Sequence, residues 1–357
     1  MSHRIRRHDR QWCAEAITRG GRVVATDAEQ RVATAQRWAT TRENVAQAGL
    51  QLIGIGAVYV AIVIFFSFAS ENFLTYSNTI NILTNVTVIG IVALGQALAI
   101  ISGGFDLSVS GVVPLGAVSF ALLVNDGVPT VLAILLVLCV GGVVGAVNGL
   151  IVTQIGINPL ITTLGTLSIT SGLAYSLSNG VTIPFKNPDN GVLADKTVGD
   201  ISYYVILLVA LSIVAFLMLR YSVFGRMLYA IGGNREASRL AGMRVNLVTV
   251  LVYVLCASLA SLAGVIVASQ LLAGSATVGA QAALQSIAAV ILGGAALTGG
   301  VGGIPGTLIG VLVLGTISNG MALMQVPAFY QQIATGTILL LAVAFGRLRH
   351  ILVGEQS

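Results

Sequence analysis

Asp106 is the first residue to consider, because it is the only acid between Glu71 and Asp126 in a long apolar region. The hydroxyls of Ser108 and Ser110 lie next to it in the chain. An ionised carboxylate at the centre of a bilayer costs about 2.5–3.5 kcal/mol, so Asp106 is expected at a surface or in a polar cavity. Its side chain could cap the helix that follows, or it could contact a substrate or gate. The residues alone leave both roles open.

The other reactive residue types do not form a catalytic or metal-binding pattern. Neither the cysteines nor the histidines are clustered with each other, and the chain contains no P-loop, nucleophile-elbow or zinc-protease motif. We therefore predict no catalytic residue, metal or cofactor on this chain, and any energy source must lie on another one. The residues considered are Cys13, Cys139, Cys256, His3, His8 and His350.

The composition indicates a membrane protein. Hydrophobic residues make up 56% of the chain and charged residues only 9%, with a mean hydropathy of +0.93, whereas about 25% of residues are charged in soluble domains. The net charge of +5 does not indicate nucleic-acid binding, because the basic residues flank apolar stretches. We expect membrane lipid, and no nucleic acid, among the partners.

Apolar stretches of about 20 residues, the length that spans a bilayer, predict an all-α polytopic protein with about ten transmembrane helices. An even number places both termini on one side. The expected spans are 50–69, 79–101, 108–125, 129–152, 159–178, 203–219, 247–270, 283–297, 306–325 and 331–346.

The basic residues orient these spans. All of them except Lys186 and Lys196 are arginines. The arginines lie in three groups, within 4–42, 220–244 and 347–349. The positive-inside rule makes all three groups cytoplasmic and leaves 179–202 as the largest external loop.

The predicted organisation has three parts. The apolar core is a transmembrane domain that contains a cytoplasmic loop, and it is flanked by an arginine-rich arm without a signal-peptide pattern and by a short cytoplasmic tail. The boundaries are 1–49 for the arm, 50–346 for the membrane domain, 220–246 for the cytoplasmic loop and 347–357 for the tail.

An internal repeat relates the two halves of the membrane domain. Shifting the chain by 171 positions aligns Asn148 with Asn319, Gln154 with Gln325, and Gly103 with Gly274. Spans two to five then correspond to spans seven to ten, with opposite direction through the membrane. Inverted repeats of this kind place a substrate path near the midplane, where helices are interrupted. The predicted path or gate residues are Asp106, Ser108, Ser110, Asn148, Gln154, Asn319 and Gln325.

Residues 232–243 predict a short cytoplasmic helix that begins after Asn234 and ends at Gly242. One face carries Ala237, Leu240 and Ala241, and two arginines lie one turn apart on another. Such a helix could lie on the membrane surface or dock a cytoplasmic partner. The residues assigned to docking are Asn234, Arg235, Glu236, Ser238, Arg239, Leu240 and Gly242.

Three motifs in order resemble the membrane permease of ribose-type sugar ABC transporters. They are residues 102–109 (SGGFDLSV), residues 232–243, and residues 287–294 (IAAVILGG) with the later Gly306-Thr307 and Asn319-Gly320. The likeness covers residues 50–346. It implies a non-catalytic subunit in the plasma (inner) membrane of a bacterium. Two copies of this subunit would work together as a dimer. ATP and Mg²⁺ would bind a cytoplasmic ATP-binding subunit, and a periplasmic or lipid-anchored sugar-binding protein would deliver the substrate.

Two departures from the family pattern affect the expected substrate. Ala283, Leu284 and Gln285 stand where an acidic pair is common, and Val301 stands where an arginine is common. These changes remove charge near the eighth span. An importer of a nucleoside or a branched-chain amino acid therefore stays open, as does an ion-coupled secondary transporter with Asp106 as its coupling group.

Overall fold

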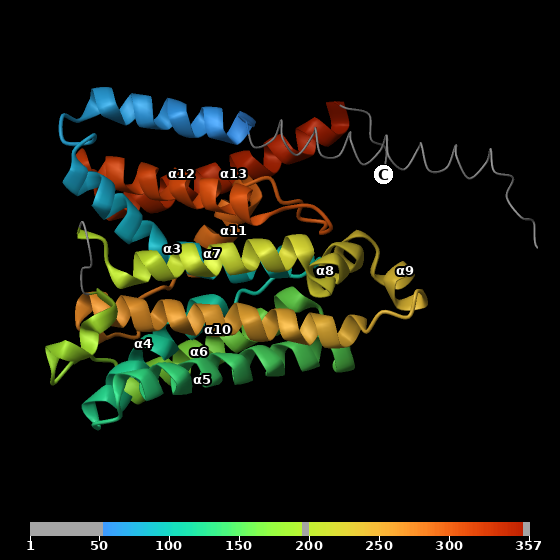
Figure 1. Cartoon of the computed structure of the whole chain (residues 1–357), viewed down its shortest axis with the longest axis horizontal. Helices are drawn as coiled ribbons and strands as arrows, with labels where there is room; N and C mark the ends of the chain where they lie inside the picture. The colour runs from blue at the N-terminus through green and yellow to red at the C-terminus, as the bar shows by residue number, and fades with distance from the viewer. Residues whose placement is uncertain (1–52, 195–199, 353–357) are drawn as a thin grey trace, which may run out of the picture. The chain divides into compact units, whose positions relative to one another are not determined.

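The computed structural model describes residues 53–194 and 200–352. The predicted arm 1–49, part of the predicted external loop and the last five residues of the predicted tail lie outside the described residues. Twelve helices are present in the described part of the chain (Figure 1). They are Ile53–Ala69, α3 Tyr76–Ile101, α4 Val109–Asn125, α5 Thr130–Leu150, α6 Pro159–Ser178, α7 Tyr203–Tyr221, α8 Val223–Gly233, α9 Arg235–Leu240, α10 Val245–Leu271, α11 Ala282–Leu292, α12 Ile304–Leu323 and α13 Ala328–Leu352.

Short irregular elements join some of these helices. A π-helical turn, Ile151–Ile155, extends α5, and a 3₁₀ helix, Pro188–Ala194, precedes α7. Strand β1, Ile183–Pro184, pairs antiparallel with β2, Ala273–Gly274. This small sheet is an addition to the predicted all-α fold, and it ties the loop after α6 to the end of α10.

Six helices of the described chain are long and apolar enough to cross a membrane, namely α3, α5, α6, α7, α10 and α12. The helix Ile53–Ala69, α4 and α11 are apolar but shorter. The predicted eighth span, 283–297, is not one continuous helix, because α11 has 11 residues and ends at Leu292. At 1.5 Å per residue it covers about 16 Å of a 30 Å core. The turn that ends it contains Gly294, whose φ is +90°.

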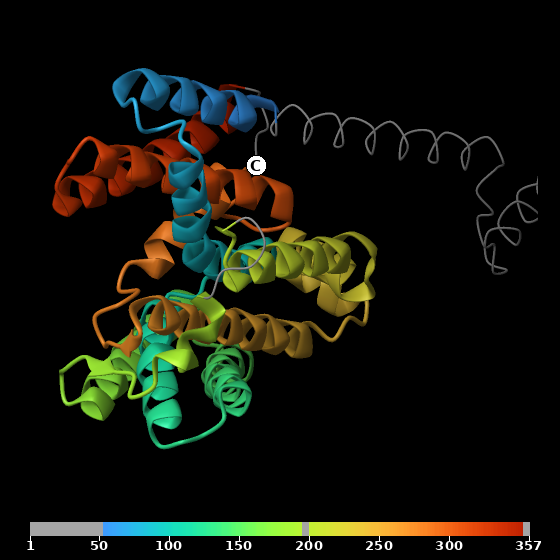
Figure 2. The ribbon, with the colours of Figure 1, turned by 60° about the vertical axis from the view of Figure 1, so that its left-hand side comes forward.

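Two groups of helices are connected through α3 and α10. In one group α10 packs against α4 and α5, and α6 packs against α4. In the other α3 packs against α11 and α12, and α13 packs against α11. Each group therefore combines three consecutive helices with one helix from the other half of the chain. Figure 2 shows α3, in light blue to teal, running steeply across between the two groups.

Glycines allow the close approach of α5 to α10. Gly141 and Gly149 face α10. A Cβ atom on Gly141 would lie 2.6 Å from the Ala257 carbonyl oxygen, and one on Gly149 would lie 2.6 Å from the Val250 Cα. Between them, a Cβ on Gly145 would overlap the α10 backbone. Small residues at every fourth position let backbones touch where no water is available to drive association.

The two ends of the helices are distinct. The end that carries α8, α9 and the start of α10 is called the α9 end, and the opposite one, with β1 and the start of α3, is called the β1 end (Figure 1). Helix α3 begins at the β1 end, and its last residue, Ile101, reaches Gly232 at the end of α8. Helix α12 begins beside the same region and therefore ends toward the β1 end.

Candidate functional site

A polar cavity opens between α3, α11, α12 and α13, toward the β1 end of the helices. It has a volume of about 440 Å³. No charged residue lines this cavity. The surrounding helices are apolar, yet many of the lining side chains carry an amide or a hydroxyl group. The polar lining residues are Asn85, Gln281, Gln285, Ser318, Asn319, Gln331, Gln332 and Thr335.

Asn319 is the predicted path residue that lines this cavity. Its Nδ2 donates to Asn78 Oδ1 at 2.9 Å. Its Oδ1 is buried and accepts no hydrogen bond from any described residue. A buried amide oxygen without a donor costs about 1–3 kcal/mol. Asn319 therefore has an acceptor whose hydrogen-bonding capacity is unused within the described chain.

The remaining amides differ in how much they are already engaged. Gln331 accepts from Ser318 at 2.9 Å and donates to the Val326 carbonyl at 3.2 Å, so it is held in place. Gln281, the cap residue of α11, and Gln285 lie one turn apart, and their side-chain amides form no hydrogen bond with a described residue. Donors and acceptors on one wall thus remain available.

Sequence reasoning missed most of this cavity. Of its polar residues it singled out Asn319 as a path residue, and Gln285 only as a departure from a family pattern. A signal was present, since polar residues inside membrane segments are costly and usually functional. Two pairs of polar residues are spaced four residues apart in apolar segments, namely Gln281 with Gln285 and Gln331 with Thr335. The spacing places each pair on one helix face.

The first predicted site residue, Asp106, lies in a buried network at the junction of α3, α4, α5 and α6. Its Oδ1 accepts from the backbone N–H of Ser108 at 3.0 Å and from the Ser108 hydroxyl. Asn148 donates to Ser108 Oγ at 2.9 Å and accepts from Thr166 at 2.6 Å. Asp106, Ser108 and Asn148 are all fully buried.

This geometry matches the capping role of Asp106 more closely than the substrate role. The carboxylate binds the backbone at the start of α4, where Ser108 occupies the cap position without capping through its own side chain. Asp106 lines neither of the two principal cavities. Its second oxygen, Oδ2, is buried and accepts from no described residue. The network joins the α3–α4 loop, α5 and α6, so its clearest role is to fix their packing.

Ser110 connects the two groups of helices. Its hydroxyl oxygen accepts from the backbone N–H of Ala283 at 2.9 Å, and both residues are buried. Ala283 is the second residue of α11, whose first N–H groups have no partner within the helix. Ser110 on α4 therefore caps α11 across the interface. A capping serine normally precedes its own helix, so the sequence could not predict this contact.

The last two predicted path residues lie apart from the cavity and from each other. Gln154 is exposed in the π-helical turn after α5, toward the α9 end. Gln325 is exposed in the turn between α12 and α13, toward the β1 end, with a φ of +59°. The structure does not bring either of them to the buried network or to the cavity lining.

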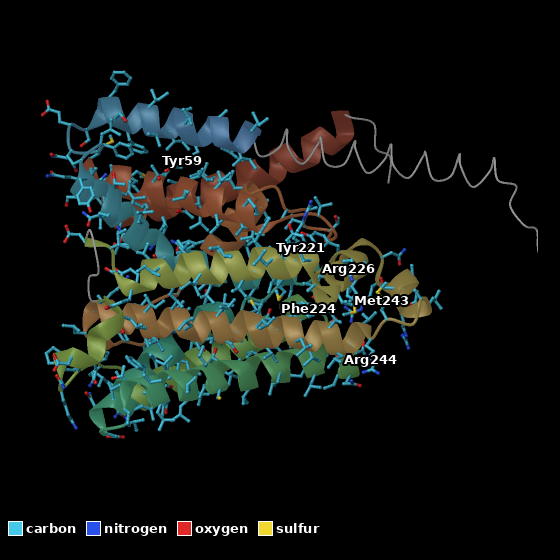
Figure 3. All side chains as sticks on the ribbon, in the orientation of Figure 1. Tyr59, Tyr221, Phe224, Arg226, Met243 and Arg244 are labelled. Atoms are coloured by element: carbon cyan, nitrogen blue, oxygen red, sulfur yellow. The ribbon has the colours of Figure 1, made fainter. Side chains whose placement is uncertain are left out.

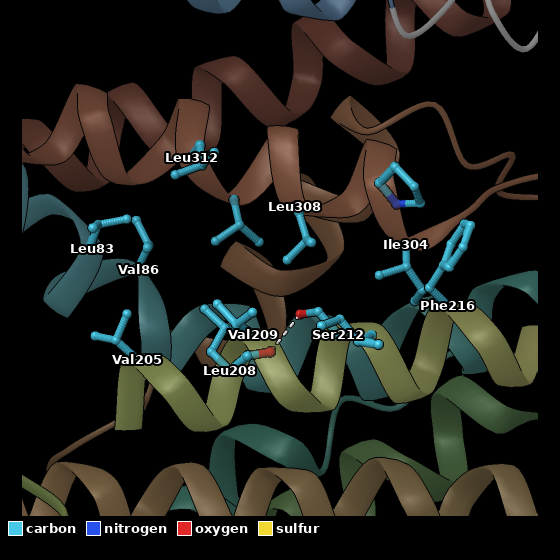
Figure 4. A pocket seen from close by; sticks show the side chains of 13 residues that line it. Leu83, Val86, Val205, Leu208, Val209, Ser212, Phe216, Ile304, Leu308 and Leu312 are labelled. Carbon is cyan, nitrogen blue, oxygen red and sulfur yellow. Dashed lines mark hydrogen bonds between the residues drawn. The ribbon is translucent and has the colours of Figure 1, made fainter. Parts of the chain in front are cut away.

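A second cavity, between α3, α7 and α12, has a different character (Figure 4). Its volume is about 410 Å³, and its lining is apolar except for Ser212, including the labelled Leu208, Leu308 and Phe216. The Ser212 hydroxyl donates to the Leu208 carbonyl at 2.7 Å. Because it offers no free polar group, this cavity does not suit a polyhydroxylated ligand.

The short helix predicted within residues 232–243 is present as α9, while its docking role stays a prediction. Asn234 Oδ1 accepts from the N–H of Ala237 at 2.9 Å, and Gly242 ends the turn with a φ of +80°. Leu240 is 81% exposed. Ser238 is buried on the opposite side. The predicted apolar face, Ala237, Leu240 and Ala241, is therefore exposed.

Charge surrounds α9. Arg235, Glu236 and Arg239 are exposed, and no described residue forms an ion pair with either arginine. Figure 3 shows Arg226 and Arg244 at the same end. This end of the described chain is strongly basic.

Comparison with known proteins decides the class of this molecule. Residues 78–343 match the family described as "branched-chain amino acid transport system / permease component". The chain belongs to this permease family. It is therefore a multi-pass membrane subunit that serves transport and catalyses no reaction.

Individual relatives are similar over most of their length. The chain is 38% identical to the ribose import permease protein of Bacillus subtilis over 80% of this chain and 89% of that protein. Identity to the ribose import permease protein of Escherichia coli K12 is also 38%, with the same coverage. Identity to the L-arabinose ABC transporter permease protein of Azospirillum brasilense is 36%, over 83% and 87% of the two chains. No solved structure matches the chain.

Proposed function

We propose that this chain is the permease subunit of a bacterial ABC importer for a monosaccharide, located in the plasma membrane. The observation that carries the proposal is the uncharged, amide-lined cavity of about 440 Å³. Amide groups both donate and accept, which suits the hydroxyls of a neutral sugar. The named activities of the ribose and arabinose permeases support the same substrate class.

The cavity favours a sugar over a branched-chain amino acid. A zwitterion carries a carboxylate and an ammonium group, and burying either without a charged partner is costly. No acidic or basic side chain lines the cavity. A nucleoside, which is also neutral, is separated from a sugar by the uptake experiment below.

Ten crossings with an inverted repeat and both termini in the cytoplasm are part of the proposal. Its support is the matching set of helix contacts: α10 with α4 and α5 corresponds to α3 with α11 and α12. The 171-residue shift exchanges these two sets. Asn148 and Asn319 then occupy equivalent positions nearer opposite ends of the helices, as an inverted repeat requires.

The proposed importer function and orientation imply the partners of this chain. The basic α9 end faces the cytoplasm, where α9 docks an ATP-binding subunit that carries ATP and Mg²⁺. The exposed Leu240 provides a small apolar face, and Arg235 and Arg239, which form no ion pair with a described residue, provide positive charge beside it. A second copy of the permease and a sugar-binding protein outside the membrane complete the importer.

The test is uptake into proteoliposomes that contain the permease with its co-expressed ATP-binding subunit and binding protein. Radiolabelled ribose, arabinose, uridine and leucine are supplied separately, with and without internal ATP. We expect uptake of a pentose only with ATP. Uptake driven by an ion gradient with this chain alone would exclude the importer, and preference for uridine or leucine would exclude the sugar.

A pair of glutamine variants tests the cavity in the same assay. Gln285→Leu removes a polar group from the lining, and we expect uptake to fall about 2–13-fold, since one hydrogen bond contributes about 0.5–1.5 kcal/mol. Gln154→Leu changes an exposed glutamine outside the cavity and should stay within twofold of the wild type. An equal loss in both variants would contradict the assignment of the cavity.

A further inference from the structure

Three glycine-rich segments, far apart in sequence, meet at the end of α8. They are the α3–α4 loop with Gly103, the last turn of α8 with Gly232, and the α11–α12 loop with Gly299 and Gly300. We call these four glycines the glycine junction. None of them lines either cavity or belongs to α9, so the transport site and the docking helix do not explain them.

The contacts at the glycine junction are between backbones. Gly300 N donates to the Ile101 carbonyl at 2.9 Å. A Cβ atom on Gly299 would lie 2.8 Å from the Gly103 Cα and 3.0 Å from the Gly232 Cα. A Cβ on Gly232 would overlap both the Ile101 carbonyl oxygen and the Gly300 nitrogen. No side chain separates the three segments, so no rotamer change can absorb a displacement of one against another.

A side-chain bond adds a second connection at the same place. The Tyr229 hydroxyl, on α8, donates to the Gly302 carbonyl at 2.9 Å. Burial raises the pKa of Tyr229, with Arg220 acting in the opposite direction, so the hydroxyl keeps its proton at neutral pH. Helix α8 is thus tied to the α11–α12 loop both through backbone packing and through this bond.

Each loop at the glycine junction leads to a functional region. The α3–α4 loop continues into Asp106 and the buried network that holds α4, α5 and α6. The α11–α12 loop joins α11, which carries Gln281 and Gln285, to α12, which carries Asn319. The third segment, α8, passes through Asn234 directly into α9.

We propose that the glycine junction transmits movement of α9 to the two loops, and so couples ATP-driven motion to the walls of the cavity. The proposal rests on the proposed function, because it takes α9 as the docking point of the ATP-binding subunit. It assigns Gly232 as a positioning residue for transport, although Gly232 touches neither substrate nor partner. A side chain there would separate the α8 segment from both loops.

The experiment compares two neighbouring glycines in the reconstituted importer. Gly232→Ala places a methyl group inside the glycine junction. Gly233→Ala is the matched control, because a Cβ there meets nothing within 4 Å. Four quantities are measured: copurification of the ATP-binding subunit, basal ATP hydrolysis, hydrolysis stimulated by sugar-loaded binding protein, and ATP-driven uptake of the sugar.

For Gly232→Ala we expect at least a tenfold loss of stimulated hydrolysis and of maximal uptake. Copurification, basal hydrolysis and the concentration of loaded binding protein that gives half-maximal stimulation should match the wild type. Gly233→Ala should stay within twofold in every measurement. A Gly232→Ala variant that also stays within twofold would overturn the proposal, as would one that loses copurification.

If Gly232→Ala fails to fold, Tyr229→Phe tests whether the glycine junction transmits movement of α9. It removes one hydroxyl, and we expect about a threefold loss of stimulated hydrolysis with basal hydrolysis unchanged. Full stimulation in Tyr229→Phe would then overturn the proposal. The wild-type complex is assayed in parallel: if it shows no ATP-driven uptake, the importer function itself fails, whereas a coupled wild type with unaffected variants refutes only the glycine junction.

Discussion

Replacing Asn148 by alanine tests whether the buried network around Asp106 is structural. The variant removes the bond to Ser108 at 2.9 Å and the bond from Thr166 at 2.6 Å. Thr166 keeps a bond to the Thr162 carbonyl. Ser108 still donates to Asp106. Neither partner loses all its bonds, so the full penalty for an unsatisfied buried group does not apply.

The expected loss follows from the two bonds. Interhelical side-chain hydrogen bonds in membrane proteins contribute on average about 0.6 kcal/mol and at most about 1.7 kcal/mol each. Asn148→Ala should therefore lower the free energy of unfolding by about 1–3 kcal/mol. The matched variant is Asn319→Ala, at the equivalent position of the proposed repeat. It removes a single bond, to Asn78, and should lower that free energy by about 1 kcal/mol or less.

The measurement is reversible unfolding of the purified permease in mixed micelles with increasing sodium dodecyl sulfate, followed by circular dichroism. Linear extrapolation gives the free energy of unfolding for the wild type and both variants. A loss below about 0.5 kcal/mol for Asn148→Ala would refute the structural role of the network. An equal or larger loss for Asn319→Ala would refute the distinction between a satisfied buried amide and one that faces a cavity.

Two further predictions concern helix packing and docking. Gly145→Ala places a methyl group against the α10 backbone and should lower the free energy of unfolding by about 1–3 kcal/mol in the same micelle assay. Gly142→Ala would meet only side-chain atoms, the Ser258 hydroxyl at 3.3 Å and the Val254 Cγ1 at 3.9 Å, and should change the free energy of unfolding by less than about 1 kcal/mol. The double variant Arg235→Glu with Arg239→Glu should reduce copurification of the ATP-binding subunit at least fivefold, and unchanged copurification would show that α9 does not dock it.

Local chemistry made several elements predictable from the sequence. The α9 helix follows from Asn234 and Gly242. The Asn234 side chain caps the start of the helix, and Gly242 ends it with a positive φ. All the predicted apolar stretches except the eighth coincide with one helix over most of their length, because length and hydropathy are local properties. The short α11 was not predicted, since its end depends on a glycine turn in an apolar run that continues past Leu292.

The role of Asp106 shows the limit of such reasoning. The sequence left a cap and a substrate contact open, since both place a carboxylate before a helix. Only the structure shows the carboxylate bonded to Ser108, the cap residue of α4, and Ser108 bonded in turn to Asn148 of α5, with all three residues fully buried. Burial of this kind depends on which helices pack together, and no local pattern contains that information.

The sequence by itself determined the membrane class, the helical segments, the grouping of the basic residues and the short helix α9, because hydropathy, charge and capping act between residues near each other in the chain. Tertiary structure alone decided the cavity and the glycine junction. Asn85 meets Gln285 and Asn319, and Gly103 meets Gly232 and Gly299, only after helices from both halves have crossed. The physical reason is that close backbone packing, which glycines permit, brings together residues that no spacing along the chain connects.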